Sequence, residues 1–306
     1  MADFDAIVIG GGPAGLTAAR RIAEAGRSVL ALEKEAFGGQ LMNLEWAEDY
    51  PGPGARIAGP ALGSQLADQA EAAGARLEIG TVDEIESYSA AKAVSLADGA
   101  AYTAGVVIVA AGLIPKPLGV AAEACLEGKG VIHCAVCDAG LYRDKEVAVC
   151  GGGDAGIIEA LYLAKFAAKV FVIEAAAQLS ARQELQERAD GNEILDIRLG
   201  RRAIDIVGDD GVTGVTIEDA ASGARQTLDA HGVLVHVGFA PATDCLDALL
   251  SLDDHGYASV DIHFESEVPG IILAGDIRRD AARSAAAAAE DGAKAAATAL
   301  RRLGPK

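Results

Sequence analysis

The segment Ala6–Leu16, AIVIGGGPAGL, joins a short apolar run to the start of a helix through a glycine-rich turn. Helical spacing continues to Ala25, and a second apolar run, Ser28–Glu33, ends in a carboxylate. This order of strand, glycine loop, helix and acidic strand end is typical of dinucleotide binding. The loop and the helix N-terminus offer N–H groups to a pyrophosphate, and the carboxylate binds a ribose hydroxyl. The segment therefore predicts a Rossmann domain.

The same arrangement occurs a second time. Residues 147–157 read VAVCGGGDAGI, a helix is expected through about Ala168, and the apolar run Val170–Glu174 again ends in a glutamate. The loops begin at Gly10 and Gly151, 141 residues apart, and in both copies the glutamate lies 23 positions after the first glycine. Because the register is kept, we expect two Rossmann domains, which suits a chain of 306 residues at about 150 residues per domain.

The remaining segments complete two α/β sheets. Periodicity predicts one further helix, about 58–74, and strands at 76–88, 93–96, 103–110, 197–207, 212–217, 226–228 and 232–237. Glycine and proline interrupt the pattern at Gly112–Pro117 and Gly238–Pro241, where the chain is expected to cross between domains. The predicted fold is α/β, with two Rossmann-like, doubly wound, three-layer domains. The second, 114–245, is inserted into the first, 1–113 with 246–306.

Composition excludes several classes of protein. With 51% hydrophobic and 23% charged residues, the chain has the composition of a globular protein with a buried core and not of a disordered one. The longest strongly apolar run, Val106–Ile114, is too short to span a bilayer. The acidic start, Met1–Asp5, does not resemble a secretory signal, so a cytoplasmic location is expected. A net charge of -19 disfavours binding to nucleic acid or to an anionic membrane.

Two cysteines suggest redox chemistry. In the run from His133 to Asp138, Cys134 and Cys137 lie three residues apart, which on a helical turn places both thiols on one face within disulfide reach. Such a pair can cycle between dithiol and disulfide. A structural zinc site needs four ligands, but the chain has no second Cys-x-x-Cys pair and no suitably spaced histidines, so no metal is expected. The remaining alternative is a pair of inert buried thiols, the kind expected for the other three cysteines, Cys125, Cys150 and Cys245. The four histidines outside this run are expected to be structural or solvated, namely His231, His236, His255 and His263.

Over essentially its whole length the chain resembles the low-molecular-weight thioredoxin reductases, flavoproteins of the pyridine nucleotide-disulfide oxidoreductase group. Six motifs occur in the family's order: Gly10–Gly15 with Glu33, Gly38–Leu41, Asp49–Gly52, Cys134–Asp138, Ala274–Asp276 and Arg283–Ala285. The resemblance implies residues that bind FAD: Gly10, Gly12, Pro13, Ala14, Gly15, Glu33, Gly39, Gln40, Val82, Gly112, Gly275, Asp276, Arg283, Ser284 and Ala285. The residues implied for a nicotinamide nucleotide are Gly151, Gly153, Asp154, Ala155 and Glu174.

The resemblance also implies roles for the cysteine pair. Cys137 would take electrons from reduced FAD, Cys134 would attack the disulfide of a protein substrate, and Asp138 would act as acid and base. Family members build the FAD domain from both ends of the chain, work as homodimers, and rotate their domains between half-reactions. Thioredoxin or a thioredoxin-like protein is the implied partner.

Three departures from the family pattern concern the cofactors. Members that use NADPH carry basic residues after the second strand of the nucleotide domain, but residues 174–178 here read EAAAQ, and Arg182 is the nearest cation. Because a carboxylate repels a 2'-phosphate and suits a free ribose hydroxyl, this segment favours NADH over NADPH. Asp49 and Ser284 stand where the family often has Asn and Gln.

Together these features predict an FAD-dependent disulfide reductase that passes electrons through Cys134 and Cys137 to thioredoxin or a similar small protein. One alternative keeps this reaction but takes electrons from ferredoxin or a reduced deazaflavin in place of NAD(P)H. A second is a dithiol oxidase that returns electrons to oxygen. A third is a flavoprotein sensor without turnover.

Overall fold

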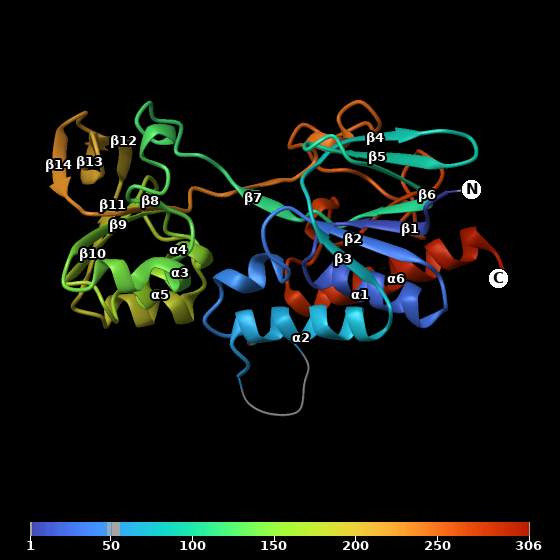
Figure 1. The fold of residues 1–306 in the computed structure, drawn as a ribbon. Coiled ribbons are helices and arrows are strands. Elements are labelled where there is room, and N and C mark those ends of the chain that lie inside the picture. Colours follow the sequence, from blue (N-terminus) through green and yellow to red (C-terminus); the bar gives the residue numbers. More distant parts are fainter. Residues whose placement is uncertain (1, 48–49, 51–55, 306) are drawn as a thin grey trace. The chain divides into compact units, whose positions relative to one another are not determined.

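The computed structural model describes residues 2–47, 50 and 56–305, which form two compact units (Figure 1). The first unit combines residues 1–114 and 240–306, and the second is the continuous segment 115–239. The sequence predicted that the second unit ends at residue 245, but in the structure it ends at residue 239. Residues 240–245 belong to the first unit, in which the Ala242 N–H donates to the Gly112 carbonyl oxygen at 3.0 Å.

A seven-stranded sheet is the centre of the first unit as far as the structure describes it. Its order is β3-β2-β1-β6-β5-β4, and β17 also pairs with β6. The strands β1, β2, β3, β6 and β17 run parallel, whereas β4 and β5 are antiparallel. The bounds are β1 Phe4–Ile9, β2 Val29–Glu33, β3 Arg76–Ile79, β4 Val82–Ser87, β5 Lys92–Leu96, β6 Ala101–Val109 and β17 Ile271–Leu273.

Apolar layers cover both faces of this sheet. The helices α1 (Pro13–Glu24), α2 (Gly59–Ala72) and α6 (Ala285–Leu303) pack over one face (Figure 1). On the other face of the parallel strands, side chains of β4 and β5, which continue the sheet beyond β6, form an apolar cluster with the C-terminal segment that contains Leu246 and Ala258. The central strands β1 and β6 are consequently buried at Ala6–Ile9 and Val106–Val109, which explains why these parts of the two strands contain only apolar residues.

Helices from opposite ends of the chain pack together in the first unit, since α1 lies directly against α6 (Figure 1). A Cβ added to Gly292 of α6 would lie 2.0 Å from the Ala14 carbonyl oxygen. We expect Gly292→Ala to cost about 1–3 kcal/mol of stability, and so to lower Tm by several degrees in thermal unfolding followed by circular dichroism. Gly140→Ala is the control, because a Cβ there meets nothing within 4 Å. An unchanged Tm for Gly292→Ala would contradict this contact.

The second unit repeats the first in a simpler form. A parallel sheet of five strands has the order β11-β10-β9-β15-β8 in the described structure. The helices α3, α4 and α5 pack on one face, and the antiparallel strands β12, β13 and β14 cover the other. The strands are β8 Val131–Ile132, β9 Glu146–Cys150, β10 Lys169–Glu174, β11 Leu195–Leu199, β12 Arg201–Gly208, β13 Val212–Asp219, β14 Arg225–Asp229 and β15 Val233–Val235. The helices are α3 Ala135–Asp138, α4 Asp154–Leu163 and α5 Gln183–Asp190.

The predicted α/β fold with two Rossmann-like units is confirmed, and its outer layers are partly made of strands. Two long strands expected from the sequence are each divided in two: 76–88 forms β3 and β4, and 197–207 forms the end of β11 and most of β12. The second division falls at Gly200, whose φ of +63° permits a turn. The two segments that connect the units pair as short strands, β7 (Leu113–Pro115) and β16 (Phe239–Pro241). In the described parts of the chain, no helix is both long and apolar enough to cross a membrane.

Candidate active site

The first glycine loop leaves room for a phosphate. Gly10 has a φ of +104°, and a Cβ there would lie 2.3 Å from the Ala110 carbonyl oxygen, so only glycine fits the turn. A Cβ at Gly15 would lie 1.8 Å from the Gly10 carbonyl oxygen, which shows how closely α1 follows β1. At Gly12, by contrast, a Cβ would meet only the Gly39 Cα, at 3.9 Å. The loop is thus tight toward the protein and open at Gly12, as a pyrophosphate requires.

The Glu33 carboxylate is fixed beside this loop. Its Oε2 accepts the Gly11 N–H at 2.7 Å, and its Oε1 accepts the Lys34 N–H at 2.9 Å. The Gly80 N–H donates to the Glu33 carbonyl oxygen at 2.8 Å, so the turn that leads into Val82 also lies here. An oriented carboxylate at this strand end suits the ribose hydroxyls of FAD.

Two further predicted FAD segments meet the start of α1. A Cβ at Gly275, whose φ is +72°, would lie 3.1 Å from the Ala14 Cβ, so the segment before Asp276 packs against the first helix. Gly39 has a φ of +55°, and a Cβ there would lie 2.9 Å from the Gly12 Cα. The segments around Gly39 and Gly275 therefore both lie against the first glycine loop and the start of α1. These closely packed backbones fit FAD, the cofactor that the resemblance implies.

Side chains hold the remaining predicted FAD residues in place. The Gln40 Nε2 donates to the Leu113 carbonyl oxygen at 3.1 Å, next to Gly112. Ser284 is the N-cap of α6, and its Oγ accepts the Ala287 N–H at 3.2 Å before the helix begins at Ala285. Capping gives a structural reason for serine at this position. Of the predicted Asp49–Gly52 turn only Tyr50 is described, and the other three residues lie outside the described part of the chain.

Sequence reasoning missed three residues around Asp276 and Arg283. Asp291 Oδ2 accepts the Gly275 N–H at 3.1 Å, and the same carboxylate forms a largely buried ion pair with Arg278. Tyr257 accepts a hydrogen bond of 2.6 Å from the Arg283 guanidinium through its hydroxyl group. Burial raises the pKa of Asp276. The only signal for Asp291 was an acidic residue in a helix otherwise rich in alanine.

The second glycine loop has nearly the same geometry as the first. A Cβ at Gly151, whose φ is +122°, would lie 2.0 Å from the His236 carbonyl oxygen. Glu174 Oε2 accepts the Gly152 N–H at 2.6 Å, and Oε1 accepts the Ala176 N–H at 2.8 Å. The Glu174 carboxylate therefore occupies in the second unit the place of Glu33 in the first.

The nearest arginine to this second loop already has a partner. Asp154, the first residue of α4, accepts the Arg182 N–H at 2.8 Å and forms an ion pair with its guanidinium at 3.4 Å. Gly153 is the N-cap of α4, and Ala155 lies in its first turn. Residues 175–178 after Glu174 are exposed and carry no charge. This segment therefore offers no cation of its own to a 2'-phosphate.

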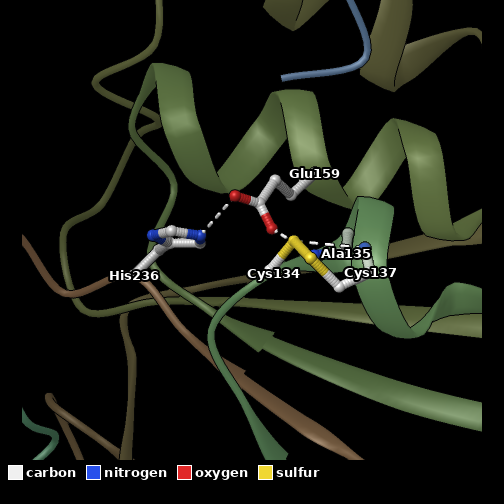
Figure 2. The surroundings of a disulfide bond; sticks show 5 residues. All are labelled: Cys134, Ala135, Cys137, Glu159 and His236. Atoms are coloured by element: carbon white, nitrogen blue, oxygen red, sulfur yellow. Dashed lines mark hydrogen bonds and ion pairs between the residues drawn. A yellow bond between two sulfur atoms is a disulfide. The ribbon is translucent and has the colours of Figure 1, made fainter. Parts of the chain in front are cut away.

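The cysteine pair forms a disulfide at the start of a short helix (Figure 2). Cys134 is the N-cap of α3, its Sγ accepts the Cys137 N–H at 3.1 Å, and the two Cα atoms are 5.4 Å apart. The helical turn expected from the spacing is present. Figure 2 also shows two buried residues beside the disulfide: Glu159, which the sequence did not single out, and His236, which was expected to be structural or solvated.

Asp138 ends the same helix, and burial raises the pKa of its carboxyl group. The carboxylate form is disfavoured because it loses hydration. The nearby Tyr142 hydroxyl also has a raised pKa, first because of burial and then because of the Asp138 charge. Asp138 therefore holds a proton to higher pH than an exposed aspartate does.

The other cysteines differ from one another. Cys150 is buried and Cys245 is partly buried, and burial raises their thiol pKa values to about 12 and about 11. Both are poor nucleophiles. Cys125 is exposed, so the expectation that it is buried was wrong. It lies in a short 3-10 helix, Ala124–Leu126, where the neighbouring Leu126 points into the core in its place. Among the described residues, no three His, Cys, Asp or Glu side chains are grouped to hold a metal ion.

Two nucleotide-binding loops and one helical disulfide on two Rossmann-like units define a class, the nucleotide-dependent disulfide oxidoreductases. The family model described as pyridine nucleotide-disulphide oxidoreductase matches residues 4–292, and the chain belongs to this family, in its low-molecular-weight thioredoxin reductase group. It is 37% identical to the thioredoxin reductase of Bacillus subtilis over 294 residues, 96% of this chain and 92% of that protein. The corresponding identity to the protein of Listeria monocytogenes is 36% over 290 residues, 94% of this chain and 90% of that one.

Comparison with solved structures supports the same family. The chain superposes on thioredoxin reductase from Lactococcus lactis with a TM-score of 0.92 and 32% identity, covering 98% of this chain and 99% of that one. The enzyme from T. acidophilum gives a TM-score of 0.89 at 32% identity, with 97% and 98% covered. FAD and a nicotinamide nucleotide are the cofactors that this family implies.

Proposed function

We propose that the chain is an FAD-dependent reductase that takes electrons from NADH and delivers them to the disulfide of thioredoxin or a thioredoxin-like protein. The net reaction converts NADH, a proton and a protein disulfide into NAD⁺ and a protein dithiol. The choice of NADH rests on Glu174, whose carboxylate is oriented by Gly152 and Ala176 as Glu33 is by its own loop. Thioredoxin as the partner is supported by the names of the relatives.

Anaerobic titration of the purified protein with NADH, and separately with NADPH, tests the electron donor. We expect about two equivalents of NADH per chain to bleach the visible absorption band of the flavin and to produce two thiols, because the flavin and the disulfide each take up two electrons. Bleaching by NADPH alone would contradict the role given to Glu174. If dithionite bleaches the band and neither nucleotide does, the donor is another carrier, such as ferredoxin or a reduced deazaflavin, and the NADH proposal fails. Rapid reoxidation in air with a dithiol substrate would instead identify an oxidase.

The chain's own residues divide the work as follows. The loop at Gly10 and Gly12, the Glu33 carboxylate and the Gly275–Asp276 segment would hold FAD, and the loop at Gly151 would hold the nicotinamide nucleotide. Bound FAD supplies a two-electron carrier between the nicotinamide and the disulfide.

Thiol–disulfide exchange completes the reaction. The Cys134 thiolate attacks the partner disulfide, which forms a mixed disulfide and releases one partner thiolate. Cys137 then attacks the Cys134 sulfur, which restores the disulfide of α3 and releases the second partner thiolate. The two leaving thiolates take up protons, and Asp138, whose pKa is raised by burial, supplies one of them.

Replacing Asp138 by asparagine tests this acid. We expect Asp138→Asn to lower kcat with thioredoxin by about 10²-fold, because the amide cannot donate a transferable proton. In the unchanged protein the rate should fall as the pH rises through the raised pKa of Asp138, where the carboxyl group loses its proton. Asp190→Asn, an exposed residue at the end of α5, is the control. A normal kcat and an unchanged pH profile in Asp138→Asn would exclude the role.

An exposed leucine next to the disulfide suits a protein partner. Leu141 lies in the short 3-10 helix Ala139–Tyr142 that follows α3, and it is 66% exposed. We expect Leu141→Ala to raise KM for thioredoxin about tenfold, since docking would bury this side chain, while flavin reduction by NADH is unchanged. Leu199→Ala, at a 39% exposed leucine of β11, is the matched control and should leave KM unchanged. Equal KM values for both variants would place the docking surface elsewhere.

The homodimer implied by the resemblance and the cytoplasmic location expected from residues 1–5 stay predictions. Size-exclusion chromatography with light scattering tests the first of them. A mass near 31.0 kDa in place of twice that value would contradict it.

A further inference from the structure

A buried glutamate, Glu159, and a buried histidine, His236, lie beside the disulfide (Figure 2). Glu159 comes from the middle of α4, and His236 directly follows β15, 77 residues later. Glu159 Oε1 and His236 Nε2 are 2.9 Å apart, and their side chains are only 6% and 3% exposed. A buried carboxylate is costly unless it is hydrogen-bonded, so the pair needs an explanation.

The second oxygen of this carboxylate reaches the redox helix. Glu159 Oε2 accepts the N–H of Ala135, the first residue of α3, at 2.7 Å. The Cys134 sulfur accepts a different N–H, that of Cys137, at 3.1 Å. One peptide N–H beside the disulfide is therefore bonded to Glu159 and is not available to a sulfur atom.

The hydrogen bonds indicate the charge of the pair. If Glu159 is a carboxylate, His236 Nε2 must carry the shared proton, because a carboxylate only accepts. His236 Nδ1 is buried and has no hydrogen-bond partner among the described residues, so a second proton there would leave a buried N–H unpaired. This pattern assigns a neutral imidazole that donates through Nε2. As a carboxylate, Glu159 is thus oriented by His236 but not neutralised by it.

We propose that Glu159, oriented by His236, is a positioning residue that withholds the Ala135 N–H from Cys134 and keeps the cysteine pair strongly reducing. A thiolate is stabilised by nearby N–H donors and destabilised by nearby negative charge. Glu159 removes one donor and adds one negative charge. Because the dithiol form is then less stabilised as a thiolate, the pair gives up its electrons more readily.

Other ionisable groups lie in the segments next to the cysteine pair and at the end of β9, and they must stay unchanged in the test. They are Asp138 and Tyr142 on the segment that follows Cys137, Cys150 at the end of β9, and the exposed pair of His133 and Glu127 that precedes Cys134, in which Nε2 and Oε2 are 3.1 Å apart. None of them is changed in the variants below.

Glu159→Gln separates charge from geometry. Its amide oxygen can still accept the Ala135 N–H, and its amide nitrogen can donate to His236 if the ring proton moves to Nδ1. We expect the thiolate fraction of Cys134 at neutral pH to rise about tenfold, measured in a Cys137→Ser background by alkylation and peptide mass spectrometry. With both cysteines present, equilibration with a dithiol buffer should show a higher potential than that of the unchanged protein, because the reduced form is then better stabilised as a thiolate. Glu184→Gln, an exposed glutamate of α5, is the control.

His236 variants test the same pair without changing Glu159. His236→Phe removes the donor, so the buried carboxyl group should take up a proton and the thiolate fraction should rise as in Glu159→Gln. His236→Gln, which restores an N–H donor, should return both quantities toward those of the unchanged protein. A purely structural role would not predict this rescue.

The proposal is overturned if Glu159→Gln leaves the thiolate fraction and the potential unchanged or moves either in the opposite direction. It is also overturned if His236→Phe and His236→Gln behave alike. The inference rests on the cysteine pair as a redox centre, but its measurements use neither nicotinamide nucleotides nor thioredoxin. A failure here is therefore distinct from a failure of the proposed donor or partner.

Discussion

Replacement of Cys134 by serine is expected to lower the reduction of thioredoxin by about 10³-fold or more, because a neutral hydroxyl group cannot take the place of a thiolate nucleophile. The two buried thiols, Cys150 and Cys245, offer no substitute. Burial raises the pKa of Cys150 to about 12 and that of Cys245 to about 11, which leaves almost no thiolate at neutral pH. FAD binding should persist, since the loop at Gly10 and the Glu33 carboxylate belong to the other unit.

The measurement is steady-state turnover with thioredoxin, together with the ratio of flavin to protein. Cys125→Ser is the control, because this exposed cysteine lies outside the redox helix and its loss should leave turnover intact. Turnover within tenfold of normal in Cys134→Ser would show that another group attacks the substrate. Loss of flavin in that variant would show that the two sites depend on one another for folding.

The second large effect concerns Glu174. Hydrogen bonds to a charged group contribute about 1.5–3 kcal/mol, so Glu174→Ala should lower kcat/KM for NADH by about ten- to a hundredfold. Adding Ala175→Arg to this variant supplies the cation that residues 174–178 lack, and kcat/KM for NADPH should rise. The two changes together should reverse the preference between the nucleotides.

Initial rates with each nucleotide, at fixed thioredoxin, measure this reversal. Glu184→Ala, an exposed glutamate of the same unit, should change neither rate. If Glu174→Ala leaves kcat/KM for NADH as it was, the Glu174 carboxylate only stabilises the turn at Gly152 and does not touch the nucleotide.

Local patterns predicted much of the site. Gly10, Gly15 and Glu33 lie within 24 residues of one another, and their geometry follows from a strand, a turn and a helix that are adjacent in the chain. The same holds for the copy at Gly151 and for the pair Cys134 and Cys137, which needs only one helical turn. Such features depend on short-range structure, which sequence periodicity reports.

Long-range partnerships could not be predicted. Glu159 and His236 are 77 residues apart, and Tyr257 and Arg283 are 26 apart. Each pair forms only when separate strands and helices have packed. A partial signal existed for Glu159, a lone acid between apolar residues in a helix, and for His236, within an apolar strand-like run. Neither signal names the partner, because one sequence holds no record of which buried polar groups meet.

The interleaving of α1 with α6 has a consequence for synthesis of the protein on the ribosome. The continuous unit, 115–239, has all of its strands and helices once its last residue has emerged. The other unit must wait for Ala285–Leu303, the helix that packs against Pro13–Glu24 and whose Gly292 lies against Ala14. During translation its N-terminal part therefore exposes apolar surface until Ala285–Leu303 has emerged, and this part is where chaperones have the most to protect.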